Sequence, residues 1–274
     1  MFAIIKPPEL NFVTTIKFIK FMIFTLSSMA LDNKLVLIFG MNGNIFDNYH
    51  VKAECFGKAL SENVIEQTGI EEKVEFYSGI YIETSGMNAL RQIETAFKRV
   101  SNAPVTQSFL EKTEKDYRDY LEIAELKTKM HADVEQFLTN NKSKYNFTIT
   151  TTVPLERIDL RAKRTGIDQY FEIICARGGV WEPGKQTIIP GFDKGKDHYD
   201  YLMKRFDTSI DNLITVSATK ADIINSRANK IQSIGVVRIF DYKGLLEISP
   251  DYIIEDYTKL PRLLERISAL NSEI

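Results

Sequence analysis

The alternation of strand-like and helical segments after residue 146 is the feature that most constrains the fold of this chain. Apolar, strand-like runs lie at residues 147–152, 171–175, 213–216 and 235–240, and helical segments lie between them at 155–165, 199–206 and 221–229. Strands joined through helical crossovers pair in parallel, so this rhythm predicts an α/β fold with a doubly wound parallel sheet and helices on both faces. In such sheets, ligands bind beyond the carboxyl ends of the strands.

A further strand is predicted near the N-terminal end of this region, at residues 35–39. The run is apolar and short enough to be a buried parallel strand. It leads into Gly40, Met41, Asn42 and Gly43, a composition typical of a tight turn. We therefore expect this loop to lie at the ligand-binding edge of the sheet.

Between these two regions the sequence is almost wholly helical, with apolar residues spaced three and four apart. Helices are expected at residues 50–64, 85–100 and 106–129, with a fourth around Val134, Phe137 and Leu138. The predicted organisation is an N-terminal extension (1–30), an α/β core (31–48 and 146–274) and an inserted helical cap (49–145).

Composition and charge exclude several classes of function. The chain has 274 residues, 44% of them hydrophobic, and a formal net charge of -2, so it can bury a large core but has no general field that attracts nucleic acid. Arg157, Arg161, Lys163 and Arg164 are clustered at helical spacing, which predicts a solvated helix face. We expect no nucleic-acid partner.

The cysteine and histidine residues do not indicate a metal or redox site. Cys55 and Cys175 lie far apart in apolar sequence and are predicted to be buried thiols. His50, His131 and His198 are scattered and show no zinc-ligand spacing. Any metal would have to be held by carboxylates.

The first thirty residues allow two interpretations. The apolar run at residues 16–26 contains Lys17 and Lys20 and is followed by small residues around Met29. An extension upstream of the domain implies a cytoplasmic protein, whereas a signal peptide implies a secreted one. The run is too short and too charged to span a bilayer, so no integral membrane insertion is expected.

The first strand and its loop resemble the opening motif of the haloacid dehalogenase-like (HAD) superfamily, Asp-x-Asp-Gly-x-x-x-Asp. In that family the first aspartate is the nucleophile and the second is the general acid/base. Gly40 and Asn42 stand at these two positions, Gly43 matches the glycine and Asp47 matches the last aspartate, which is structural. The resemblance implies a HAD-like, Rossmann-type core with an inserted cap.

Later segments extend the resemblance over roughly residues 34–264. Thr151 lies where the family has a hydroxyl that holds the phosphoryl group, and Lys194 or Lys196 lies where it has a lysine that neutralises the nucleophile and the phosphate. Ala218 and Asp222 occupy the two acidic positions of the motif that binds Mg²⁺ in the family. The sequence does not choose between the two lysines.

The substitutions remove the chemistry that the resemblance implies. Glycine has no side chain to attack with, an amide at residue 42 cannot transfer a proton as a carboxylic acid does, and Asp222 alone would hold Mg²⁺ only weakly. We therefore predict a catalytically inactive, phosphatase-like protein with no cofactor. Its partner would be a small phosphorylated ligand or another protein.

Ligand binding without catalysis and catalysis by other residues are the two alternatives. An anion-binding nest that needs no metal is expected from Asn42, Gly43, Thr151 and either Lys194 or Lys196. The runner-up function is a phosphomonoester hydrolase with a rearranged, Mg²⁺-dependent active site. Asp47 is disfavoured as its nucleophile because it matches the structural aspartate.

A protein-binding role would draw on the cap tyrosines, which are Tyr77, Tyr81, Tyr117 and Tyr120. Their spacing favours packing between cap helices over an exposed partner surface.

Overall fold

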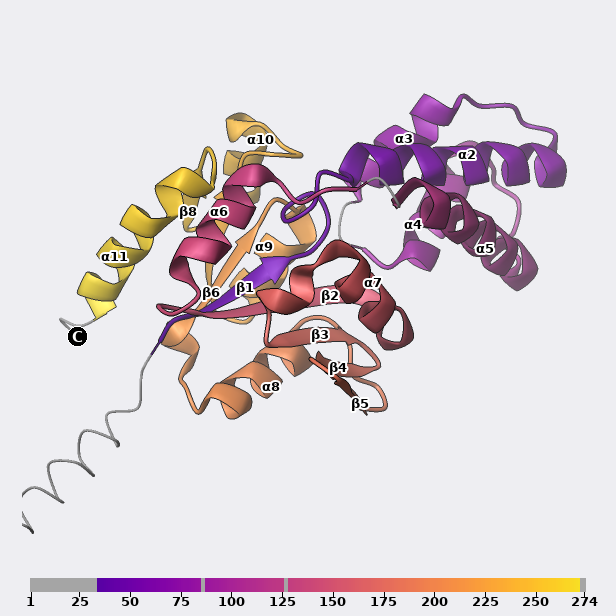
Figure 1. The fold of residues 1–274 in the computed structure, drawn as a ribbon. Helices are drawn as coiled ribbons and strands as arrows, with labels where there is room; N and C mark the ends of the chain where they lie inside the picture. The colour runs from indigo at the N-terminus through magenta and orange to yellow at the C-terminus, as the bar shows by residue number, and fades with distance from the viewer. Residues whose placement is uncertain (1–33, 85–86, 126–127, 272–274) are drawn as a thin grey trace, which may run out of the picture. The chain divides into compact units, whose positions relative to one another are not determined.

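The computed structural model describes residues 34–84, 87–125 and 128–271 (Figure 1). The two interpretations of residues 1–30 lie outside these residues and stay predictions. Within the described part of the chain, none of the helices has the length and apolar character needed to cross a membrane.

An eight-stranded sheet forms the centre of the α/β core. Its strands are β1 (Val36–Gly40), β2 (Asn146–Pro154), β3 (Ile173–Arg177), β4 (Gly179–Glu182), β5 (Lys185–Ile188), β6 (Leu213–Ser217), β7 (Gln232–Val236) and β8 (Tyr252–Ile254). They are ordered β5-β4-β3-β2-β1-β6-β7-β8. All neighbours from β3 to β8 pair in parallel, and β4 and β5 add an antiparallel edge. This confirms the predicted doubly wound sheet.

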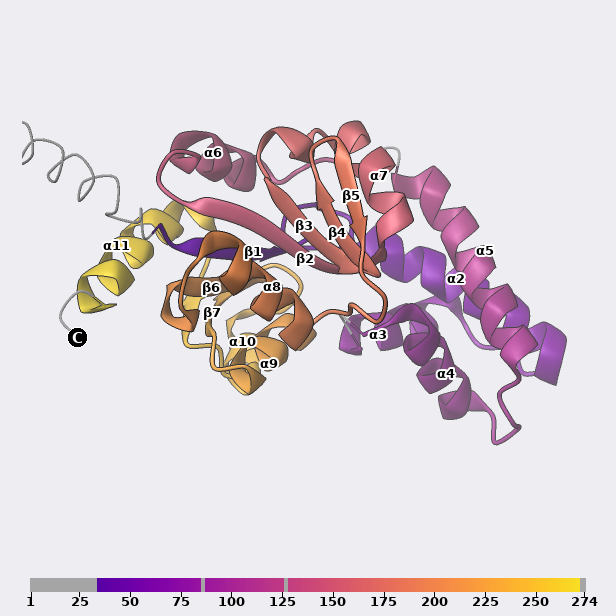
Figure 2. The ribbon, with the colours of Figure 1, turned by 90° about the horizontal axis from the view of Figure 1, so that it is seen from below.

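Helices cover both faces of this sheet, as Figure 2 shows. The described helices are α2 (Tyr49–Thr68), α3 (Val74–Glu83), α4 (Ala89–Val100), α5 (Gln107–Ala124), α6 (Ala132–Asn141), α7 (Ile158–Thr165), α8 (Lys196–Phe206), α9 (Lys220–Ala228), α10 (Tyr242–Ile248) and α11 (Leu260–Asn271). Helices α6, α7 and α11 contribute to one core cluster, and α8 contributes to another.

Strand β1 explains why both faces must be covered. Successive side chains of a strand point to opposite faces. Leu37 and Phe39 belong to the cluster that includes α6, α7 and α11, whereas Val36 and Ile38 belong to the cluster that includes α8. All four side chains have an exposed fraction of 0%. The continuous apolar run at residues 35–39 is therefore a strand buried on both faces.

The cap helices α2 to α5 have a hydrophobic core of their own. Phe56, Tyr77 and Phe97 are fully buried in it, and Tyr81 and Tyr117 are nearly so. The cap tyrosines thus pack between helices, and Tyr120, which is partly buried, packs against the same cluster.

Helix α6 was placed in the cap by the sequence, within residues 49–145. Its residues Val134, Phe137 and Leu138 are instead buried in the core of the sheet. The helical segment that builds a separate core ends with α5, because α6 presents its apolar residues to the strands.

Several predicted boundaries differ from the observed ones. Helix α2 continues to Thr68, where Gly69 adopts φ +71° and ends it with an N–H bond to Ile65. The expected helix at 85–100 is α4, and α3 and the β4–β5 hairpin were not predicted. Helix α7 ends at Gly166 (φ +70°), as expected from the glycine.

Candidate functional site

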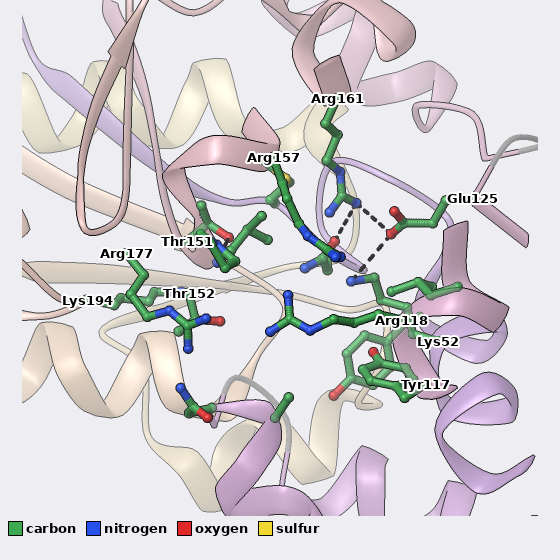
Figure 3. Close-up of a pocket in the computed structure, with 18 of the residues that line it drawn as sticks. Lys52, Tyr117, Arg118, Glu125, Thr151, Thr152, Arg157, Arg161, Arg177 and Lys194 are labelled. Atoms are coloured by element: carbon green, nitrogen blue, oxygen red, sulfur yellow. Dashed lines mark hydrogen bonds and ion pairs between the residues drawn. The ribbon is translucent and has the colours of Figure 1, made fainter. Parts of the chain in front are cut away.

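A cavity of about 360 Å³ lies at the carboxyl ends of the central strands (Figure 3). Asn42 follows β1, Thr151 and Thr152 lie in β2, and Thr219 follows β6. The opposite wall comes from cap helices α2, α4 and α5, and α7 closes one side. The cavity is therefore at the edge where the sheet topology predicts a ligand.

Gly40 ends β1 at this edge, and the space beside it is filled. A Cβ atom added to Gly40 would lie 2.4 Å from Oδ2 of Asp222 and 2.7 Å from Oγ of Ser217. Non-bonded heavy atoms do not approach this closely, so these neighbours would have to move. The position of the family's nucleophile is thus occupied by two side chains that arrive from the β6–α9 region.

Asp222 is held there by two polar partners. Its Oδ1 forms an ion pair with Nζ of Lys194, and its Oδ2 accepts a 2.6 Å hydrogen bond from Oγ of Ser217. The exposed fractions are only 9% for the Lys194 side chain and 3% for that of Asp222. Burial removes both charges from water, and the contact between them offsets part of that cost, so the loss of either partner would leave a buried charge unpaired. This group, Gly40 with Ser217, Asp222 and Lys194, is called the loop end of the cavity below.

Asn42 belongs to a second polar network that joins the loop to the cap. Its Oδ1 accepts hydrogen bonds from Arg161 (2.8 Å) and from Nδ2 of Asn48 (3.3 Å). Arg161 also donates to Oε1 of Glu125 at 2.8 Å, and Nζ of Lys52 lies 3.4 Å from the same oxygen. Dashed lines in Figure 3 follow the contacts of Glu125. Asn42 therefore fixes an arginine and has no proton to transfer as an acid.

The charges in this network shift the pKa values of its members. Burial lowers the pKa of Lys52 from 10.5 to about 8, although the Glu125 carboxylate opposes the shift. Burial by itself raises the pKa of Glu125, but the charges of Lys52 and Arg161 outweigh that effect and hold the pKa below its usual value. Glu125 is therefore a carboxylate at neutral pH.

The structure separates the two candidate lysines. Lys194 lines the cavity, whereas Lys196 is exposed and forms an ion pair with Asp200 one turn further along α8. The structure therefore brings Lys194, and not Lys196, to the cavity. The sequence could not choose because the two lysines are only two residues apart at the start of α8.

The N–H of Gly43, one of the predicted nest residues, has acceptors within its own loop. It already donates to the carbonyl of Phe46 and to Oδ1 of Asn48, at 3.0 and 3.2 Å. The residue is buried, and an added Cβ would meet Ile239 at 2.6 Å. In this structure Gly43 therefore shapes the loop, and its N–H is not free to bind an anion.

The structure places the remaining sequence candidates in different surroundings. Thr151 lines the cavity, although its Oγ1 already accepts a 3.2 Å bond from the N–H of Val153. Ala218 is fully buried after β6. Asp47 is exposed and is not among the cavity-lining residues, so it is not positioned to replace the nucleophile.

The donor set at the loop end does not fit Mg²⁺. This ion requires several oxygen ligands in near-octahedral geometry. Glycine and alanine stand at two of the family's carboxylate positions, and both oxygens of Asp222 already have protein partners. Among the described residues there is no group of three or more acidic, histidine or cysteine side chains arranged to hold a metal. The side chains at the loop end therefore do not support a Mg²⁺-dependent step.

Arginines line the rest of the cavity, and sequence reasoning missed them. In the segment that was predicted to be a solvated helix face, Arg157, Lys163 and Arg164 are exposed, as expected, but Arg157, Arg161 and Arg164 also line the cavity. The exposed fraction of the Arg161 side chain is only 13%. Arg118 from α5 and Arg177 at the end of β3 also line it. The signal was the density of arginine on one helix directly after a strand that ends at the ligand-binding edge.

The comparison with known proteins supports the fold. No family model matches the sequence, and no curated protein matches it significantly. Among solved structures, a haloacid dehalogenase-like family hydrolase from Streptococcus pneumoniae is similar over 85% of this chain and 99% of its own, with a TM-score of 0.63 and 15% identity. A hydrolase from Pseudomonas syringae is similar over 85% of this chain and 99% of its own, with a TM-score of 0.64 and 16% identity.

A third similar structure, from Haemophilus somnus, is described as a predicted phosphoglycolate phosphatase. It covers 85% of this chain and 98% of its own, with a TM-score of 0.64 and 13% identity. At such identities the likeness establishes the fold alone. The chain therefore has the HAD-like α/β fold, which is the fold of an enzyme family.

Proposed function

We propose that this protein binds a phosphorylated small molecule in its cavity without hydrolysing it. The observation that carries the proposal is the filled space beside Gly40, where Oδ2 of Asp222 would be 2.4 Å from an added Cβ. The place from which a carboxylate at residue 40 would attack a phosphorus atom is taken up by a buried ion pair.

Asp222 is a poor substitute for the missing nucleophile. Its side chain is almost fully buried, and its two oxygens are engaged by Lys194 and Ser217. An attacking carboxylate needs an oxygen free to approach phosphorus in line with the leaving group. Asn42 accepts hydrogen bonds from Arg161 and Asn48 and supplies no acid to protonate that leaving group.

Binding is supported by the cavity itself. It lies at the ligand-binding edge of the sheet, its volume of about 360 Å³ suits a small metabolite, and basic side chains line it from both the core and the cap. The guanidinium groups of arginine offer paired N–H donors that match phosphate oxygens.

The proposal is tested by measuring binding and turnover on the full chain. Calorimetry with inorganic phosphate and a panel of phosphomonoesters should detect binding. A phosphate-release assay with the same panel and Mg²⁺ should show no turnover. Release that disappears in Asp222→Asn, but persists in the matched exposed variant Asp200→Asn, would favour the rearranged hydrolase instead. Absence of binding by every compound would also contradict the proposal.

A further inference from the structure

The charges around the cavity do not balance. Its basic lining residues are Lys52, Arg118, Arg157, Arg161, Arg164, Arg177 and Lys194, and its acidic lining residues are Glu114, Glu122, Glu125, Glu156 and Asp222. Seven positive groups thus face five negative ones. A low-dielectric cavity with an excess of one sign concentrates counter-ions of the other sign.

Ion pairs neutralise the basic groups unevenly. Asp222 pairs with Lys194, and Glu114 pairs with Arg118 one turn away on α5. Glu125 serves both Lys52 and Arg161. Arg157 and Arg164, which are exposed, and Arg177, which is half-buried, form no ion pair with a carboxylate of the described chain. The acidic lining residues that remain, Glu122 and Glu156, are exposed as well.

Two local electrostatic effects disfavour the positive charge of Arg157. The residue is the N-cap of α7, where the aligned peptide dipoles disfavour a positive charge. Arg161 lies four residues further along, and like charges at this spacing repel. Arg161 is compensated by Glu125, but Arg157 has no such partner among the described residues. Arg157 is exposed, so water solvates its charge in the free protein, and the side chain is available to an anion that enters the cavity.

The uncompensated arginines approach the cavity from different walls. Arg157 comes from the turn before α7 and Arg177 from the end of β3. Figure 3 shows both side chains extending into the cavity, with Arg118 reaching in from the cap. Arg157, Arg164 and Arg177, with Arg118 opposite, are called the arginine end below.

We infer that the ligand carries at least two anionic groups, as a bisphosphate or a phosphorylated carboxylic acid does, and that Arg157 and Arg177 bind the second group. This inference rests on the proposed function for the first, phosphoryl group. One phosphate ester is matched by one or two guanidinium forks, whereas three uncompensated arginines leave positive charge for another anion.

The test compares matched probes that differ in one anionic group. Calorimetry on the full chain at low ionic strength would use glucose 6-phosphate against glucose 1,6-bisphosphate, and glycerol 3-phosphate against 3-phosphoglycerate. We expect the doubly anionic member of at least one pair to bind about ten-fold more tightly, which is the size of one additional charge-assisted contact.

Variants assign that preference to the arginine end. Arg157→Gln and Arg177→Gln should each reduce the preference several-fold, and Arg157→Lys should retain part of it because the charge remains while the planar fork is lost. Lys163→Gln is the matched control, since Lys163 is an exposed cation on α7 that pairs with Asp159. It should leave the preference unchanged.

Two results overturn the inference while the proposed function stands. One is equal binding of the two members of both pairs. The other is a preference that survives both arginine-to-glutamine variants in protein shown by its circular dichroism to be folded. Failure of the proposed function looks different, because it appears as phosphate release or as no binding of any probe.

Discussion

The loop end and the arginine end of the cavity both contain basic side chains, but these differ in their pairing with carboxylates. At the loop end, Lys194, Asp222 and Ser217 satisfy one another beside Gly40 and are buried. At the arginine end, Arg157 and Arg177 face the cavity without a carboxylate partner in the described chain. Under the proposed function, this difference means that a HAD-like fold can close the space beside the first strand while arginines elsewhere in the cavity stay available to an anion.

The largest expected effect on stability comes from removing the charge of Asp222 at the loop end. Asp222→Asn leaves Lys194 buried without a counter-charge and is expected to reduce the free energy of unfolding by about 3–5 kcal/mol. Urea denaturation measures the effect. The matched control is Asp200→Asn, which breaks the exposed pair with Lys196 and should change stability little. Similar losses in both variants would contradict a closed, buried pair at the loop end.

Adding a methyl group at Gly40 tests whether the space beside it is filled. Gly40→Ala places its Cβ in the space of Asp222 and Ser217, so we expect a loss of about 1–3 kcal/mol from overpacking. In Gly79→Ala, the added Cβ would meet no described atom within 4 Å inside α3, and the variant should gain up to about 1 kcal/mol from helix propensity. A neutral Gly40→Ala would mean that the space beside β1 is open.

The network of Lys52, Glu125 and Arg161 should make stability depend on pH. Burial lowers the pKa of Lys52 to about 8, against 10.5 in the ordinary state. Between these values the unfolded chain binds a proton that the folded chain does not, so stability rises with pH through this window, by at most about 1.4 kcal/mol per pH unit.

The variant Lys52→Met isolates that contribution. The difference in unfolding free energy, wild type minus variant, should increase from pH 8 to pH 10.5. Lys98→Met removes an exposed lysine of α4 and serves as the control. A wild-type advantage that falls over this range would show that the charged form of Lys52 is the one favoured by folding.

The smallest expected effect is at the arginine end. Arg157→Gln removes a cation from a helix N-terminus and from the neighbourhood of Arg161, so stability should stay constant or increase by at most about 0.5 kcal/mol. Arg161→Gln, on the same helix, removes the partner of Glu125 and Asn42 and should destabilise clearly. Equal losses in thermal denaturation would show that Arg157 serves the fold.

The fold could be predicted because its signals are local and repeated. The apolar run at residues 35–39 and the alternation after residue 146 each reflect strands buried between helices, and Gly166 ends a helix wherever the chain goes next. The assignment of α6 failed because periodicity reports that a helix has an apolar face, not which surface that face contacts.

The site was predicted only in part for the same reason. The losses at Gly40, Asn42 and Ala218 are visible in the motif, but the sequence does not show that Asp222 and Ser217 fill the space beside Gly40. The arginines of α7 follow helical spacing whether they face water or a cavity. Only the position of the cap, which brings Glu125 to Arg161, distinguishes the two cases.

A crystal structure of the protein with Mg²⁺ and the tightest-binding bisphosphate or phosphorylated acid would test the central claim most directly. The account predicts an intact ligand with one anionic group within hydrogen-bond distance of Arg157 and Arg177, and an unbroken contact between Asp222 and Lys194. A cleaved ligand, a phosphoryl group on Asp222 or a metal ion bound by it would contradict the account.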